Sequence, residues 1–150
     1  MELILWRHAE AEPGEPDLGR RLTAKGHQHA ERVGAWLDRQ LPATTRVLSS
    51  PAERAVQTAQ GLKRKFRVDN GLAPGATVGA VLAAVSWPDA REPVLVVGHQ
   101  PTLGEVAAYL LTGDELAWSV RKCSAWWISS RVRDGVRSVV LKAVVGPEFV

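Results

Sequence analysis

Three apolar runs of the sequence end on side chains that can bind or accept a phosphoryl group. Arg7 and His8 follow the first run, Arg54 lies one turn beyond the second, and His99 follows the third. A guanidinium presents a planar fork of N–H donors that matches phosphate oxygens. A neutral imidazole can attack phosphorus and take the phosphoryl group onto its nitrogen. If these side chains meet, they predict a site for a small tetra-oxygen anion with a histidine as acceptor.

Strand ends are the elements that would bring these side chains together. The runs "LILW", "TRVLS" and "PVLVVGH" are short and apolar, which is typical of strands buried on both faces of a sheet. Ligands of an open α/β sheet bind beyond the carboxyl ends of its parallel strands. If the three strands are neighbours, the two arginines and two histidines converge on one crevice.

Helical patterns separate the three strands. Apolar periodicity predicts helices over 23–41, 50–62, 78–85 and 100–113. The second start is the clearest, because Ser50 suits the N-cap, Pro51 suits the first helical position and Glu53 completes a capping box. Alternating strands and helices predict parallel crossover units with helices on both faces of the sheet.

The pattern changes after Glu115. Residues 116–122, 124–132 and 136–145 are predicted as strands, with Asp134-Gly135 as the hairpin turn between the last two. These strands would add an antiparallel edge. The predicted fold is therefore a three-layer α/β/α arrangement with a mostly parallel central sheet, in a single domain over residues 1–150. Trp126 and Trp127 are adjacent and point to opposite faces of a strand, so one of them is expected to be exposed. Because an exposed tryptophan on an edge strand permits a dimer, the chain is expected to be a monomer or weak dimer.

Composition limits the function classes. A net charge of +3 is a small surplus, and it does not favour a nucleic-acid or membrane partner. Cys123 is the only cysteine, so no disulfide forms within the chain and no cysteine metal cluster is available. No apolar run approaches the ~18 residues of a membrane span, and no signal-peptide pattern is seen. We expect a cytoplasmic protein that uses no metal and no cofactor.

Three segments carry a resemblance to a known family. "LWRHAEA", "SSPAERAVQTA" and "VLVVGHQP" resemble the three signature blocks of the histidine phosphatase superfamily, which is also called phosphoglycerate-mutase-like. The blocks occur in order, each at the expected strand end, and the resemblance spans residues 2 to about 112. With "RRLTAKG" at 20–26 and the small size, the chain is most similar to the SixA-type phosphohistidine phosphatases.

The resemblance implies a role for each matching residue. His8 would be the nucleophile, while Arg7, Arg54 and His99 would hold the phosphoryl oxygens. His99 would also stabilise the transferring group. Three further residues are candidates for substrate binding: Arg20, Ser50 and Gln100.

Two positions depart from the family pattern. Ala9 stands where the signature has glycine, which narrows the approach to His8. Larger members carry a carboxylic acid after the second block, where this chain has Asn70-Gly71-Leu72. Glu10 is the candidate general acid, and Asp69 is the other nearby carboxylate. A missing acid handicaps release of an alkoxide but matters less for a protonated imidazole, which favours phosphohistidine over phosphoserine as substrate.

The sequence therefore predicts a metal-independent phosphatase that forms a phosphohistidine intermediate and acts on protein phosphohistidine. One alternative is a small-molecule phosphomonoesterase of the same superfamily, for which segments 10–21 and 69–76 would have to form an enclosing lid. Another is a phosphoprotein-binding module without turnover. A nucleic-acid binder is the weakest alternative.

Overall fold

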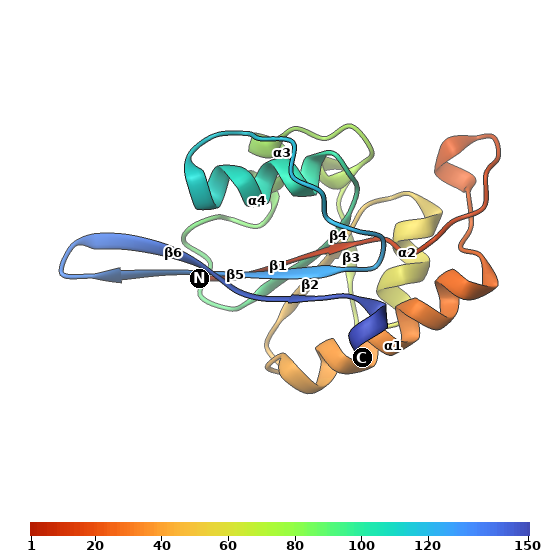
Figure 1. Cartoon of the computed structure of the whole chain (residues 1–150), viewed down its shortest axis with the longest axis horizontal. Coiled ribbons are helices and arrows are strands. Elements are labelled where there is room, and N and C mark those ends of the chain that lie inside the picture. Colours follow the sequence, from red (N-terminus) through yellow and green to blue (C-terminus); the bar gives the residue numbers. More distant parts are fainter.

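The computed structural model describes residues 1–150 and contains one six-stranded sheet (Figure 1). Its strands are β1 (Glu2–Arg7), β2 (Arg46–Ser49), β3 (Arg67–Val68), β4 (Val94–Gly98), β5 (Ala125–Arg133) and β6 (Val136–Val145). The order across the sheet is β3-β2-β4-β1-β5-β6. β1, β2, β3 and β4 run parallel, whereas β5 is antiparallel to both β1 and β6. The predicted parallel sheet with an antiparallel edge is confirmed. The two-residue β3 was not predicted.

Four α-helices cover the two faces of the sheet: α1 (Ala24–Gln40), α2 (Glu53–Gln60), α3 (Val78–Ala84) and α4 (Thr102–Thr112). Helices α1 and α2 lie on one face, and α3 and α4 on the other (Figure 1). The two-residue period of β1 explains the two cores, because Ile4 and Trp6 join the α1/α2 side while Leu3 and Leu5 join the α3/α4 side. The three-layer prediction is confirmed. No helix is long and apolar enough to cross a membrane.

The start of α2 differs from the prediction. The helix begins at Glu53, its N-cap is Ala52, and no side chain caps it, so the capping box expected at Ser50 is wrong. Residues 50–52 instead continue away from β2 before the helix begins, with Ala52 in an extended conformation. The Ser50 hydroxyl accepts a hydrogen bond from the Ala52 N–H and contacts His99. A hydroxyl expected to stabilise a helix therefore organises the carboxyl end of β2 and β4.

The segment 116–122 is not a strand, which corrects the third strand predicted in the tail. Because β5 occupies the position beside β1, no strand edge is left there for the segment to pair with. Side chains bind its backbone instead: Gln100 Nε2 donates to the Trp118 carbonyl (2.9 Å) and Arg7 Nη1 donates to the Val120 carbonyl (3.0 Å). Its approach to α4 requires Gly104, where a Cβ would lie 1.7 Å from the Trp118 oxygen.

The remaining tail is the predicted hairpin. Asp134 and Gly135 both have positive φ (52° and 77°), as a tight turn between two twisted strands requires. The expectation of one exposed tryptophan is wrong. Trp127 is buried and donates its indole N–H to Glu2, and Trp126 is half-buried beside Trp118, with ring centroids 6.1 Å apart. The 116–122 segment thus covers a surface that the sequence pattern left open.

Candidate active site

A cavity of about 220 Å³ lies at the carboxyl ends of β1, β2 and β4. Its lining residues are Arg7, His8, Ala11, Arg20, Arg54, Pro74, His99, Gln100 and Lys122. The parallel register places Arg7 opposite Gly98, so His8 and His99 leave adjacent strands side by side, with ring centroids 5.1 Å apart. The four side chains predicted to converge do so.

His8 is held in one tautomer by its neighbour in the chain. Its Nδ1 lies 2.7 Å from the Ala9 carbonyl oxygen. Because a carbonyl oxygen only accepts hydrogen bonds, Nδ1 carries the proton and donates, which leaves the lone pair on Nε2. The Ala9 N–H donates to Thr58 Oγ1 (3.0 Å), which fixes this turn of backbone. Ala9 does not have positive φ, so its methyl group replaces the family's glycine without backbone strain.

Both site histidines are neutral at pH 7. Burial is the main cause that lowers the pKa of His8 to about 4, and the positive charges of Arg54, Arg7 and Arg20 add to it. Burial likewise lowers the pKa of His99 to about 3, with the adjacent His8 as the next cause. A neutral imidazole with a free Nε2 is the form that can attack phosphorus.

His99 is positioned by Ser50. Its Nε2 lies 2.7 Å from the Ser50 hydroxyl oxygen, and Ser50 is fully buried. Ser50 is not among the residues that line the cavity, so the structure places it behind His99 rather than where it would touch a substrate.

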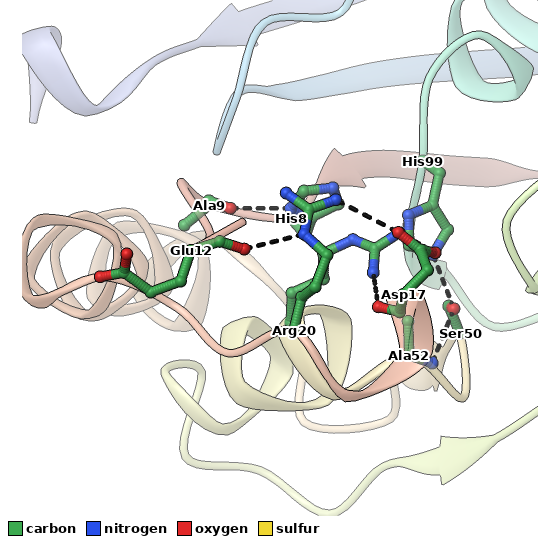
Figure 2. Close-up of polar contacts among 9 residues, drawn as sticks. His8, Ala9, Glu12, Asp17, Arg20, Ser50, Ala52 and His99 are labelled. Atoms are coloured by element: carbon green, nitrogen blue, oxygen red, sulfur yellow. Dashed lines mark hydrogen bonds and ion pairs between the residues drawn. The ribbon is translucent and has the colours of Figure 1, made fainter. Parts of the chain in front are cut away.

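Arg54 is the most buried cation of the cavity, with 4% of its surface exposed. Both of its terminal nitrogens point to Asp17: Nη1 donates to the Asp17 carbonyl (2.7 Å) and Nη2 to the carboxylate (3.1 Å). Figure 2 shows Asp17 in one cluster with Arg20, Ser50 and His99. Its Nε is buried without a hydrogen-bond partner. An unpaired buried N–H is costly, and a phosphate oxygen would satisfy it.

Asp17 is a site residue that the sequence reasoning missed. It lies in the short 3₁₀ turn Asp17–Gly19 within the loop 10–21 and also accepts a hydrogen bond from Arg20 Nη1 (3.3 Å). Hydrogen bonds from Arg54 and Arg20 lower the pKa of its carboxyl group. The spacing Asp-x-x-Arg at 17–20 was its only signal in the sequence, since its contact with Arg54 is long-range.

Arg20 and Gln100 both line the cavity, as predicted for substrate-binding candidates. Arg20 is oriented by its Nε, which donates to the Glu12 carbonyl (2.8 Å). The Gln100 amide is engaged within the protein, because it donates to the Trp118 carbonyl and accepts from the Gly104 N–H. Lys122 also lines the cavity and was missed, because it lies in the segment predicted as a strand.

Neither predicted carboxylate reaches the cavity. Glu10 accepts a hydrogen bond from the Thr23 hydroxyl (3.0 Å), and Asp69 accepts one from the Gly71 N–H (2.8 Å). No Asp or Glu is among the lining residues. Glu10 is therefore not placed to act as a general acid. No group of three or more His, Cys, Asp or Glu side chains is arranged to hold a metal ion.

Comparisons with known proteins agree with this geometry. A profile of the histidine phosphatase superfamily (branch 1) matches residues 3–75. The chain is 31% identical over 126 residues to a phosphohistidine phosphatase SixA homologue of Haemophilus influenzae, covering 73% of this chain and 77% of the relative. It is 31% identical over 123 residues to the phosphohistidine phosphatase SixA of Escherichia coli, covering 76% of each. The solved structure of the protein histidine phosphatase SixA complexed with tungstate superposes with a TM-score of 0.79 at 26% identity, covering 98% of this chain and 97% of the other.

Proposed function

The chain belongs to the histidine phosphatase superfamily and is similar to its SixA-type enzymes, and from this premise we propose that it hydrolyses phosphohistidine on proteins through a phosphorylated His8. The observation that carries the proposal is the His8 tautomer. Its Nδ1–H is bound to the Ala9 carbonyl, so Nε2 is free and neutral beside Arg7 and Arg54.

In the first step, His8 Nε2 attacks the phosphorus atom of the substrate. The Nε2–P bond forms as the bond from phosphorus to the substrate imidazole breaks, and the electron pair leaves with that imidazole. Arg7, Arg54 and His99 donate to the phosphoryl oxygens and balance their charge. The Arg54 Nε, which has no partner in the protein, is one donor available for this purpose.

In the second step, water attacks the phosphorus atom of phosphorylated His8. The O–P bond forms as the Nε2–P bond breaks, and the electron pair of the broken bond returns to Nε2. Nδ1 keeps its proton, so His8 is again the neutral imidazole, and both protons of the water leave with the product as dihydrogen phosphate. The arginines neutralise charge in both steps, so the proposal assigns no role to a metal ion. The Ser50 hydroxyl accepts a hydrogen bond from the Ala52 N–H and keeps its own proton, which we assign as donated to His99 Nε2. In this assignment the ring proton of His99 is on Nδ1, and Nδ1 donates to a phosphoryl oxygen.

The substrate class follows from the leaving group. No carboxylic acid lines the cavity to protonate an alkoxide, and Asp17, whose pKa is lowered by Arg54 and Arg20, is ionised and has no proton to donate. A phosphorylated imidazole protonated on its remote nitrogen leaves as a neutral molecule and needs no such acid. Two relatives are named phosphohistidine phosphatases, which supports the same choice.

A small phosphate ester is the second candidate substrate. Segments 10–21 and 69–76, the two candidate lids, both contribute to the cavity wall: Ala11 and Arg20 come from the first and Pro74 from the second. This partial enclosure suits a compact substrate better than a flat surface would.

Phosphate release in excess chelator tests the proposal. A phosphohistidine peptide and an aryl phosphate are offered to the unmodified chain, to His8→Ala and to the control His27→Ala, which changes an exposed histidine of α1. We expect release from the peptide to survive chelation and in the control, and to fall by about 10³-fold or more in His8→Ala. Faster turnover of the aryl phosphate than of the peptide would favour the second candidate, and release that needs added metal would overturn the mechanism.

A further inference from the structure

A second hollow of about 380 Å³ adjoins the cavity, and we call it the basic groove. Four cations line it: Arg7, Lys25, Arg121 and Lys122. Arg7 and Lys122 line the cavity as well, so the two hollows are neighbours that share these side chains. Whatever projects a phosphoryl group toward His8 would therefore have neighbouring atoms within reach of the groove.

The groove cations are not neutralised by the protein. Lys25, Arg121 and Lys122 are exposed, and none of them belongs to an ion pair of this structure. Two carboxylates, Glu10 and Glu148, also line the groove. They leave an excess of positive charge, and Glu10 already accepts a hydrogen bond from the Thr23 hydroxyl.

The placement of these cations does not serve the fold. Lys25 lies in the first turn of α1, which contains no acidic residue, and a cation there faces the positive end of the helix dipole. Arg121 and Lys122 project from the segment that Arg7 and Gln100 bind through the Val120 and Trp118 carbonyls. Residues of the cavity thus hold this segment beside it, which presents the two cations at a fixed position next to the site.

We propose that the basic groove binds acidic side chains that flank the phosphorylated histidine of a protein substrate. The proposal rests on the proposed function and deepens it, because it names the chemistry that the enzyme recognises around the phosphohistidine. Asp and Glu side chains complement the excess charge and are short enough to sit beside the phosphorylated residue. The groove also explains how a small cavity could select one phosphoprotein segment over another.

Phosphohistidine peptides that differ only in their flanks test the groove. We compare kcat/KM for flanks of Glu, of Gln and of Lys, in the unmodified chain and in Lys25→Glu/Arg121→Glu. The expected preference for Glu over Gln is about tenfold at low salt and shrinks as ionic strength rises. The double variant loses this preference and gains on the Lys-flanked peptide, a gain that a damaged fold would not produce.

Lys65→Glu is the matched control, because Lys65 is exposed and precedes β3, at the opposite end of the parallel strands. It should keep the preference for Glu flanks. Equal kcat/KM for all peptides in the unmodified chain, or an unchanged preference in the double variant, would overturn the groove alone. Turnover of an aryl phosphate without turnover of any phosphohistidine peptide would overturn the proposed function and the groove together.

Discussion

The carboxyl ends of β1, β2 and β4 and the β5–β6 hairpin belong to one sheet but differ in what surrounds them. β4 is fully buried, and polar residues follow directly after it. β6 is an edge strand whose apolar residues are largely exposed, among them Val136 (67%) and Val140 (54%). A strand end enclosed by loops and helices can hold ionisable groups out of water, whereas an edge strand cannot. The groups suited to catalysis are therefore concentrated at the strand ends, whereas the hairpin should tolerate substitution.

The largest expected difference is in kcat/KM, between substitutions of Arg54 in the cavity and of Arg131 in the hairpin. Arg54→Ala should lower kcat/KM by about 10³-fold, and Arg54→Lys by about 10²-fold, because lysine keeps the charge but lacks the planar fork. Arg131→Ala, in an exposed position of the hairpin, is the matched change and should leave kcat/KM unaltered. Full activity of Arg54→Lys would show that charge alone is sufficient at this position.

Alanine in place of glycine should lower the free energy of unfolding more beside the site than in the hairpin. Gly104→Ala should cost more than about 3 kcal/mol, because the added Cβ would lie 1.7 Å from the Trp118 carbonyl oxygen and displace the 116–122 segment. Gly135→Ala, at φ +77° in the hairpin turn with open space around it, should cost about 1–2 kcal/mol. Urea unfolding measures both, and equal losses would contradict the close approach of α4 to the segment.

Protonation of His8 and His99 should destabilise the fold as the pH falls from 7 to 5. The folded pKa of His8 is about 4, below the ordinary 6.5, so the unfolded chain binds more protons between these values and stability falls as pH drops through this window. The loss should be about 2 kcal/mol for each site histidine between pH 7 and 5. His8→Gln should remove its share when urea unfolding is repeated at the two pH values, and an unchanged pH dependence in His8→Gln would contradict the assignment.

The loop carboxylate should oppose anion binding. Asp17 occupies both terminal nitrogens of Arg54 and repels a phosphate dianion, so Asp17→Asn should strengthen inhibition by tungstate about fivefold. Asp134→Asn in the hairpin turn is the control. Weaker inhibition in Asp17→Asn would show that the carboxylate positions Arg54 more than it competes for it.

The smallest expected effect is in the hairpin. Val140→Thr should change the free energy of unfolding by less than about 0.5 kcal/mol, because this side chain is 54% exposed. The same substitution at fully buried Val96 of β4 should cost about 1–3 kcal/mol, since it buries a hydroxyl group. A large effect at Val140 would indicate that β6 is covered in solution.

The sequence alone determined the features that depend on local patterns. Short apolar runs between amphipathic segments predicted the parallel sheet and its two helical layers, and positions directly after those runs predicted that Arg7, His8 and His99 share a site. The turn at Asp134-Gly135 was also predictable, because glycine readily adopts the positive φ that it requires.

Only the tertiary structure decided which partners the polar groups take. Ser50 looked like a helix cap but contacts His99, and Asp17 looked like a loop residue but binds Arg54 across 37 positions of the chain. The 116–122 segment had a strand-like pattern, yet β5 lies beside β1, and the carbonyl groups of the segment accept hydrogen bonds from side chains instead of from a strand. Local periodicity records which side of an element is buried, whereas hydrogen-bond partners depend on which distant segments arrive there, and that competition is settled only when the whole chain packs.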